Sequence, residues 1–265
     1  MENEPKALFE IKDQIAVFTL NNPPQNRLVA EVYLALNAAL DQIAASDARV
    51  LIIQANGNDF SYGGYFPSWI DKKPAELKPV FTAGLAINNR LEALPIPVIA
   101  SVHGACWGGA FELALRCDII IATPEATFNH PEKTLGVTTL MGGVYRFAER
   151  ATRNIAAELA YTSEPLGAER LYQLGTVNRL VPREKLEEEC MRLAKDIAIG
   201  PPRAHTAHKS LLNAWSAGGI AAADQVLLDL SAVLFDMNDV DMALKSAKEA
   251  LESGQKRPKL QFNGN

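Results

Sequence analysis

The sequence predicts an α/β protein built around mainly parallel strands, and three observations support this fold class. Short, mostly apolar runs at 50–54, 98–102 and 118–123 have the length and composition of strands buried on both faces. Helical patterns separate these runs, so strand, loop and helix alternate along the chain. The composition, 265 residues of which 48% are hydrophobic and 22% charged, is that of a globular protein with one main core.

The N-terminal elements follow from the spacing of apolar residues. Two strand-like runs, 7–11 and 15–20, are separated by the turn-forming residues KDQ and therefore predict a hairpin. After the loop NNPPQN, apolar residues recur at near-helical spacing over 28–44, which predicts an amphipathic helix. This helix leads into the strand 50–54, which ends in the turn-rich loop NGNDFSYGGY.

The middle of the chain continues the alternation. A helical pattern over 83–94 stops at Pro95 and Pro97, and the strand 98–102 follows. The stretch GACWGGAFELALRC predicts a loop and then a helix, before the third apolar run at 118–123. The loop PEATFNHPEKTLG comes next, and the turns between these units keep the strands parallel.

The composition shifts after a pair of prolines near residue 200. Two Ala-rich stretches, 204–234 and 240–252, have helical patterns. We therefore divide the chain into a core of residues 1–200 and a C-terminal helical region of residues 201–265. Only the tail after Ser253 is predicted to be flexible.

Charge and cysteine usage exclude several classes of protein. The net charge is -5 with no stripe of Lys and Arg, which argues against binding of a nucleic-acid backbone. The three cysteines, Cys106, Cys117 and Cys190, have no CxxC spacing, so we expect neither a disulfide framework nor a structural zinc site. We find no leader pattern and no unbroken apolar run near the roughly 18 residues of a membrane span. The sequence therefore predicts a cytoplasmic protein without membrane contacts.

Two glycine pairs stand where predicted strands end, Gly63–Gly64 in FSYGGY and Gly108–Gly109 in WGGAFE. Glycine lets the backbone turn so that its N–H groups point outward, and the second pair also opens a helix. Two such N–H groups, one from each loop, can hold a carbonyl oxygen that is gaining negative charge. This interpretation requires the loops to converge; the alternative is two tight turns.

Two acids follow these glycines. Glu112 lies three residues after Gly109, one helical turn on the same face. Glu132 lies in the loop after the third apolar run, where open α/β sheets form ligand-binding crevices. If they converge on one water, they can act as general base and acid, and their mutual repulsion raises one pKa. The alternative for each is a solvated or helix-capping carboxylate.

The ordered motifs FSYGGY, HGACWGGAFELALRCDIIIAT, ATFNHPEKTLG, AERLYQLGTVNRLVP and ALESGQKRP resemble the crotonase superfamily, the enoyl-CoA hydratase/isomerase family. The resemblance runs over about residues 9–258. It implies a spiral of ββα units with a C-terminal helical region used in trimerisation, often as a dimer of trimers. It also implies an acyl-CoA substrate, with no metal and no cofactor other than the coenzyme A of that thioester.

The resemblance assigns roles to individual positions. Gly64 and Gly109 match the two residues whose N–H groups hold the thioester oxygen. Glu112 and Glu132 match the two glutamates with which hydratases activate a water that adds to the β-carbon, while a proton goes to the α-carbon. Isomerase members commonly lack the acid at the position of Glu112, so the presence of both favours hydration.

The sequence also departs from the family pattern around the acyl group. Tyr62 and Tyr65 flank the first glycine pair, where many members have a small residue and Asp, which implies an altered or smaller pocket. The family's PGxGG segment is TTLMGG here, with Leu140 at the position whose N–H often helps to hold the water. Trp107 is a candidate pocket wall. His130 could orient the substrate or tune Glu132, although a lone His is more often structural.

These observations favour a hydratase of 2-enoyl-CoA thioesters and leave two alternatives. One is an isomerase, a decarboxylase or a specialised biosynthetic member of the same superfamily. The other is a non-catalytic acyl-CoA-binding or scaffold protein. The retention of both glutamates argues against the second, because nothing structural obviously requires acids there.

Overall fold

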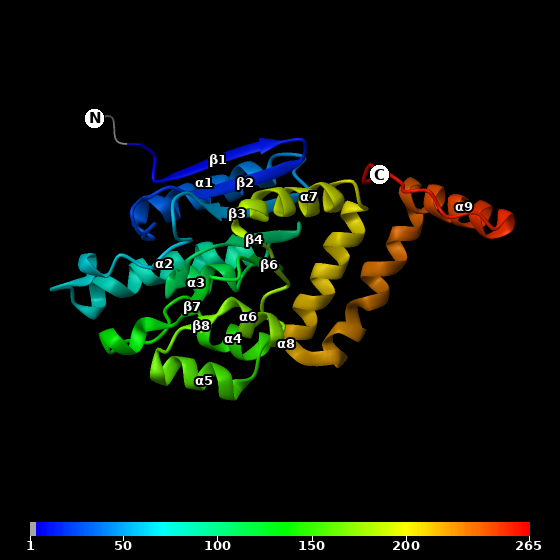
Figure 1. Ribbon diagram of the computed structural model, residues 1–265. Coiled ribbons are helices and arrows are strands. Elements are labelled where there is room, and N and C mark those ends of the chain that lie inside the picture. Colours follow the sequence, from blue (N-terminus) through cyan, green and yellow to red (C-terminus); the bar gives the residue numbers. More distant parts are fainter. Residues whose placement is uncertain (1–3) are drawn as a thin grey trace.

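A six-stranded sheet forms the centre of the protein in the computed structural model, which describes residues 4–265 (Figure 1). The first two strands pair antiparallel as the predicted hairpin, and every later neighbour is parallel. The α/β prediction is therefore confirmed. In spatial order the strands are β1 (Ala7–Lys12), β2 (Ile15–Leu20), β3 (Val50–Ala55), β4 (Val98–Val102), β6 (Ile119–Ala122) and β9 (Arg179–Leu180).

Both faces of the central strands are buried. Alternate side chains point to opposite faces, so Phe18 packs toward α1 (Ala30–Ala44) while Val17 packs toward α7 (Leu186–Ala198). This two-sided burial explains why these strands are almost continuously apolar in the sequence.

A second, three-stranded sheet carries the loops of the candidate site. It contains β5 (Ala105–Trp107), β7 (Thr127–Asn129) and β8 (Leu166–Gly167), with β5 and β7 parallel. The sequence pattern predicts loops for the first two stretches, and this prediction is wrong. Strands this short carry too few side chains to show a period of two, and their pairing depends on residues about twenty positions apart.

The helix α2 (Pro74–Glu92) begins nine residues before the predicted start at 83. Pro79 lies inside it, and a proline usually signals a break. The start is stabilised instead by Glu76, whose side chain accepts a hydrogen bond of 3.0 Å from the Lys73 N–H. Pro74 occupies the first turn, where a proline is tolerated, so both features mark the start of the helix here.

Short helices connect the strands of the core, namely η1 (Phe66–Trp69), α3 (Gly109–Ala114), η2 (Pro131–Leu135), α4 (Gly143–Arg150), α5 (Arg153–Thr162), α6 (Ala168–Gln173) and η3 (Arg183–Lys185). Of these, α4 and α5 lie below the central sheet in Figure 1.

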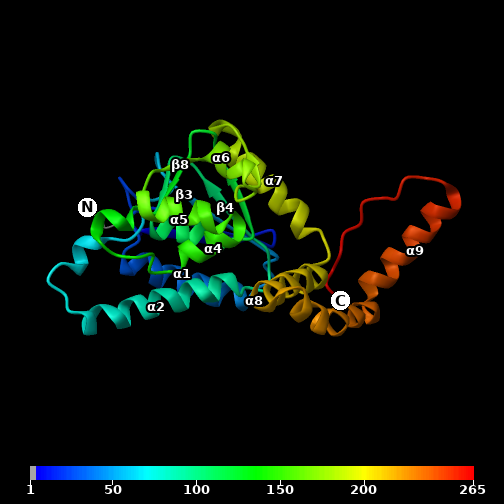
Figure 2. The ribbon, with the colours of Figure 1, turned by 90° about the horizontal axis from the view of Figure 1, so that it is seen from below.

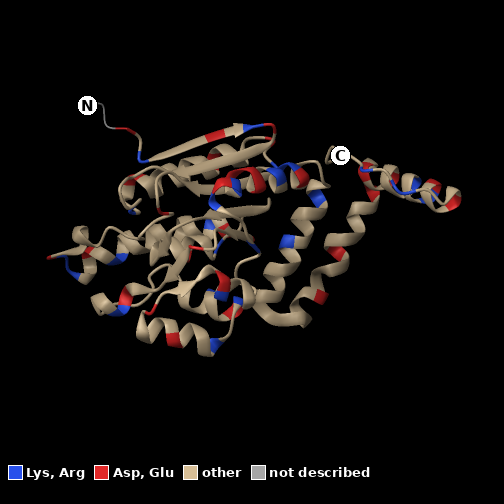
Figure 3. Ribbon diagram, in the orientation of Figure 1, with Lys and Arg blue, Asp and Glu red and all other residues tan. Residues whose placement is uncertain are grey.

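The C-terminal region consists of α8 (Pro202–Ala232), η4 (Val233–Asp236) and α9 (Asn238–Ser253), which extend away from the core (Figures 1 and 2). The chain bends inside α8 at Gly218 and Gly219, whose backbone angles are not helical. Charged side chains are sparse along α8 (Figure 3). Its exposed apolar side chains include Leu212, Trp215, Ile220 and Leu228.

By length and composition, residues 202–236 qualify as a candidate membrane span. The most apolar 18-residue window has a mean hydropathy of 1.4, and 0% of it is buried. The sequence predicts no such stretch by the criterion of an unbroken apolar run, whereas many alanines raise the mean hydropathy here. A helix that packs against another protein surface meets the same criterion.

The C-terminal tail, predicted to be flexible, folds back onto the protein. The buried Asp239 carboxylate accepts hydrogen bonds from the N–H groups of Asn263 (2.9 Å) and Gly264 (2.6 Å). The Arg49 guanidinium donates to the Phe262 carbonyl at 2.6 Å. These partners lie far apart in sequence, so local composition gave no sign of the contacts.

Candidate active site

The two glycine loops converge, as the sequence interpretation required. The Ser61 N–H donates to the Ala105 carbonyl (2.9 Å), and the Trp107 N–H donates back to the Ser61 carbonyl (3.0 Å). On its other side the first loop is held by the Leu28 N–H, which donates to the Gly63 carbonyl at 2.9 Å. Main-chain hydrogen bonds thus fix the first loop against β5.

The approach of the loops is so close that only glycine fits at position 63. Gly63 has a φ of +79°, and a Cβ there would lie 2.5 Å from the Trp107 carbonyl oxygen and 2.8 Å from the Gly109 nitrogen. A Cβ on Gly109 would in turn lie 3.5 Å from the Gly64 nitrogen. Within residues 4–265, neither the Gly64 nor the Gly109 N–H donates a hydrogen bond, so an oxygen that docks between them can accept from both.

Glu112 lies in the first turn of α3 and is only 2% exposed. One carboxylate oxygen, Oε1, accepts hydrogen bonds from the N–H groups of Met141 and Gly143, both at 2.8 Å. Burial raises the pKa of Glu112, while these main-chain donors oppose the shift. The carboxyl group is therefore held in one orientation within an apolar surround.

Glu132 lies in η2, and its side chain is 13% exposed. A Cβ on Gly108 would lie 3.4 Å from its Oε1, so the carboxyl group faces the start of α3. Burial raises the pKa of Glu132 to about 7; its own backbone N–H opposes the shift, and the charge of Glu112 adds to it. Such a group exchanges a proton readily near neutral pH.

The raised pKa of Glu132 predicts a stability cost that depends on pH. Below pH 4.5 the carboxyl group is protonated in the folded and the unfolded chain alike. As the pH rises from 4.5 toward 7, the group ionises in the unfolded chain but stays protonated in the folded one. The free energy of unfolding therefore falls over this range. We expect Glu132→Gln to raise the free energy of unfolding by up to about 3 kcal/mol at pH 8, and by almost nothing at pH 4. Urea unfolding at both pH values measures this. An equal gain at both would contradict the assigned pKa.

His130 does not line an open pocket. Its ring is 1% exposed and lies beside Phe111 and Phe147, with centroid distances of 5.0 and 6.4 Å. Burial lowers the pKa of His130 to about 4, so the ring is neutral near pH 7. Its Nδ1 lies 3.8 Å from Glu132 Oε2. The structure thus places the His130 ring in the apolar core beside Glu132, where it can tune that carboxyl group.

The other pocket candidates divide into two groups. Tyr62 packs edge-on against Trp107 with ring centroids 5.2 Å apart, and the Trp107 indole N–H donates to Thr127 Oγ1 at 3.0 Å. These two rings form a wall beside the glycine loops. Tyr65, by contrast, is 45% exposed. The Leu140 N–H favours the charged form of Glu112, while the hydrogen bonds to that carboxylate come from Met141 and Gly143.

The described residues contain no metal-binding cluster of three or more His, Cys, Asp or Glu side chains. Cys106, Cys117 and Cys190 are buried and free. What the site offers is a pair of main-chain donors and two carboxyl groups of raised pKa. That arrangement suits a carbonyl compound whose adjacent carbon gains or loses a proton.

Residues 10–255 match the sequence profile described as enoyl-CoA hydratase/isomerase. The chain belongs to this family. A probable enoyl-CoA hydratase of Bacillus subtilis is 30% identical over 254 residues, 94% of this chain and 95% of the relative. A carnitinyl-CoA dehydratase of Salmonella typhimurium is 32% identical over 203 residues, 76% and 78% of the two chains.

Solved structures confirm the crotonase fold of this enoyl-CoA hydratase/isomerase family member. A Geobacillus kaustophilus structure described as enoyl-CoA hydratase subunit I has a TM-score of 0.89 and 29% identity, covering 98% of each chain. A Streptomyces coelicolor structure described as a putative enoyl-CoA hydratase has a TM-score of 0.89 at 24% identity, which supports the fold alone. The names of the relatives cover hydration and dehydration, so membership does not select one reaction.

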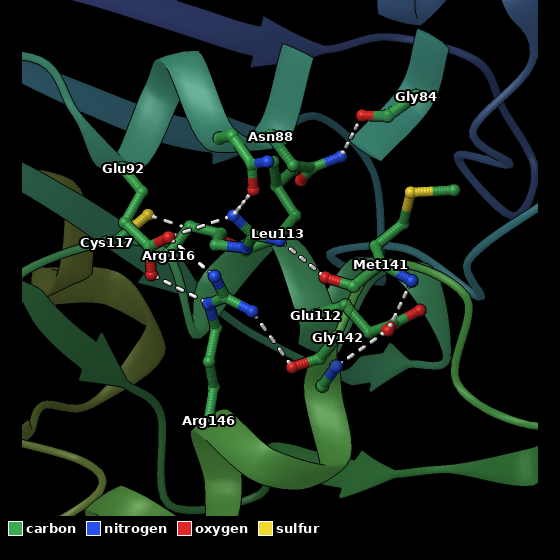
Figure 4. A network of polar contacts seen from close by, with 12 residues as sticks. Gly84, Asn88, Glu92, Glu112, Leu113, Arg116, Cys117, Met141, Gly142 and Arg146 are labelled. Atoms are coloured by element: carbon green, nitrogen blue, oxygen red, sulfur yellow. Dashed lines mark hydrogen bonds and ion pairs between the residues drawn. The ribbon is translucent and has the colours of Figure 1, made fainter. Parts of the chain in front are cut away.

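In this family member the loop that holds Glu112 is itself held by two arginines (Figure 4). Arg116, 1% exposed, donates to the Met141 carbonyl at 2.6 Å, and Arg146 donates to the Gly142 carbonyl at 3.2 Å. With its carbonyls directed at the guanidinium groups, the loop turns N–H groups toward Glu112.

Glu92 joins the two arginines. It accepts from Arg116 at 2.9 Å and from two nitrogens of Arg146 at 2.7 Å each. The sequence pattern does not predict this network. Arg116 lies one helical turn after Glu112, but its partners on α2 and in the loop before α4 could not be inferred from spacing.

We expect Arg116→Met to lower the free energy of unfolding by about 2 kcal/mol, because it leaves the Met141 carbonyl without its donor and weakens the network around Glu92. Loss of the nearby positive charge should also raise the pKa of Glu112. Urea unfolding and carboxyl ¹³C NMR titration measure the two effects.

The matched control for this prediction is Arg90→Met, which breaks the exposed pair of Arg90 with Asp41 and should cost less than about 1 kcal/mol. Equal losses in both variants, with an unchanged Glu112 titration, would show that the Arg116 network does not position the carboxylate.

Proposed function

We propose that this protein is an enoyl-CoA hydratase that reversibly adds water to the double bond of a 2-enoyl-CoA thioester. One observation carries the proposal: the buried carboxyl group of Glu112 and the largely covered one of Glu132, 13% exposed, flank the start of α3, where the Gly64 and Gly109 N–H groups are unengaged. Similarity to relatives named as hydratases supports the same reaction. No metal or redox cofactor is required for it.

In the proposed mechanism the thioester oxygen accepts hydrogen bonds from Gly64 and Gly109. These bonds strengthen as the oxygen becomes an enolate, which lowers the barrier to attack at the β-carbon. Glu112, whose charged form is favoured by two main-chain donors, takes a proton from the attacking water. Glu132, with a pKa of about 7, delivers its proton to the α-carbon.

The proton inventory closes after each turnover. Hydroxide is added to the β-carbon and a proton to the α-carbon, which leaves Glu112 protonated and Glu132 ionised. Return of one proton from Glu112 to Glu132 restores the starting state. Dehydration follows the same path in reverse.

The test is the absorbance of the enoyl-thioester band with crotonyl-CoA and with a longer 2-enoyl-CoA. A hydratase bleaches the band and releases no free thiol. Appearance of the band from a 3-enoyl-CoA would indicate an isomerase instead. Binding of acyl-CoA without turnover of either compound would favour the non-catalytic alternative.

We also propose that the C-terminal region joins copies of this chain into a trimer or a dimer of trimers in the cytoplasm. The support is the exposed apolar surface of α8 and α9, including Leu228 at 74% and Leu251 at 83% exposure. Other copies of the chain, rather than a membrane, would cover this surface. Sedimentation in detergent-free buffer should give three or six chains per particle, and a stable monomer would refute the assembly.

A further inference from the structure

His130 is a buried side chain whose two ring nitrogens have no hydrogen-bond partner among residues 4–265. Its ring is 1% exposed and lies beside Phe111 and Phe147. A neutral imidazole carries one N–H donor and one acceptor nitrogen, and leaving either of them buried without a partner costs free energy. The ring therefore has unused hydrogen-bonding capacity in a place where such capacity is costly.

An oxygen atom that is also unpaired lies next to this ring. Nδ1 of His130 is 3.8 Å from Oε2 of Glu132, which is too far for a hydrogen bond. Oε2 is buried and has no hydrogen-bond partner in the part of the chain that the structure describes. A movement of about 1 Å would bring the nitrogen and the oxygen within hydrogen-bond distance.

The ring of His130 is held more firmly than the carboxyl group. Ser163 Oγ, at the end of α5, donates to the His130 carbonyl at 2.8 Å and so fixes the main chain. On the ring itself, Phe111 packs against one side with a centroid distance of 5.0 Å. A Cβ on Gly143 would lie 2.6 Å from His130 Cε1, so α4 closes on the ring edge. Closure of the 3.8 Å gap is therefore a movement of the Glu132 carboxyl group.

The charge of Glu132 decides when this movement is favourable. While the carboxyl group is protonated it is a weak acceptor, but its ionised form is a strong one. That ionised form is disfavoured by burial and by the charge of Glu112. The adjacent Lys133 does not offset this, because its ammonium group donates to the Thr162 carbonyl at 3.3 Å. An N–H on Nδ1 of His130 would supply the missing donor to Oε2.

We propose that His130 is a positioning residue whose Nδ1–H donates a hydrogen bond to Oε2 of Glu132 once Glu132 has given its proton to the α-carbon. A bond that forms during proton transfer, and not before it, stabilises the transition state more than the bound substrate. His130 keeps its own proton throughout, so the proton inventory of turnover is unchanged. The proposal rests on the proposed function for the identity of the proton step, whereas the contact itself requires only that Glu132 ionises.

The test begins with His130→Phe, which keeps an aromatic ring in the core and removes both nitrogens. Without the donor the carboxylate of Glu132 is less stable, so we expect the pKa of Glu132 to rise by about 1 from its wild-type value of about 7. Carboxyl ¹³C NMR titration measures this rise. With crotonyl-CoA, kcat should fall about tenfold with little change in KM, while its alkaline limb moves to higher pH.

A matched pair of variants separates the donor from packing. His130→Asn places an amide N–H near the position of Nδ1, whereas His130→Leu has the same branched shape without a donor. Asn should return both the pKa of Glu132 and kcat toward their wild-type values, and Leu should resemble Phe. His208→Phe, at an exposed position on α8, should change neither quantity.

Two results would overturn the proposal. In the first, the titration of Glu132 is the same in wild type, His130→Phe and His130→Leu, so that the ring only fills the core. The second needs no variant: ¹⁵N NMR of wild type, above the pKa of Glu132, places the imidazole proton on Nε2. The hydratase proposal is tested separately, because the expected titration shift without turnover of crotonyl-CoA would support the contact and refute hydration.

Discussion

Replacement of Glu132 by Gln is expected to lower kcat for the hydration of crotonyl-CoA by a factor of about 10³. Gln keeps the size of the side chain but cannot deliver a proton to the α-carbon. The buried site offers no obvious substitute, because the neighbouring His130 is neutral and Glu112 is committed to two main-chain donors. The loss should fall on kcat rather than on KM, since the thioester would still dock on the glycine amides.

The matched control for this loss is Glu125→Gln, which changes an exposed carboxylate on the loop before β7 and should leave kcat unchanged. Glu112→Gln should lose activity to a similar degree, because it removes the base. Near-normal kcat in Glu132→Gln would exclude this residue as the acid and would require another proton source.

Replacement of Gly63 by Ala is expected to reduce kcat/KM by at least about 10³-fold, because it disrupts both proposed oxyanion donors at once. The added Cβ would meet the Trp107 carbonyl at 2.5 Å and the Gly109 nitrogen at 2.8 Å. Both are main-chain atoms held by the pairing of the two loops, so neither can rotate away as a side chain would. Relief therefore requires the loops to separate.

Gly57→Ala separates this effect from backbone strain. Gly57 also has a positive φ, +84°, yet a Cβ there would meet nothing within 4 Å. Each variant should lose about 1 kcal/mol of stability from strain, but only Gly63→Ala should lose activity. Similar kcat/KM values in the two variants would show that the reaction does not depend on the close approach of the two loops.

Much of the fold was accessible from local pattern. The hairpin and the strands 50–54 and 98–102 match β1–β4 closely, because burial on one or both faces sets the composition of each run. The elements that were not predicted depend mostly on contacts between residues far apart in the sequence. The helix start at Pro74 was missed for a local reason, because Pro79 inside the helix reads as a break. Short strands such as β5, by contrast, exist only because β7 pairs with them.

The candidate site also contains residues that local spacing predicts and residues that it does not. The two glycine pairs and the two glutamates were found because their roles depend on residue type and on spacing within one loop or helical turn. Arg116 and Glu92 were missed because their contact joins residues 24 positions apart.

The main-chain character of the site has a genetic consequence. The proposed oxyanion donors and the donors to Glu112 are peptide N–H groups. A mutation cannot remove such a group simply by changing a side chain. Any missense change of a glycine codon adds a Cβ, and at Gly143 that atom would lie 2.6 Å from both Glu112 and His130. Inactivating missense alleles of this gene should therefore include changes at these glycines, which supply no side chain to the reaction.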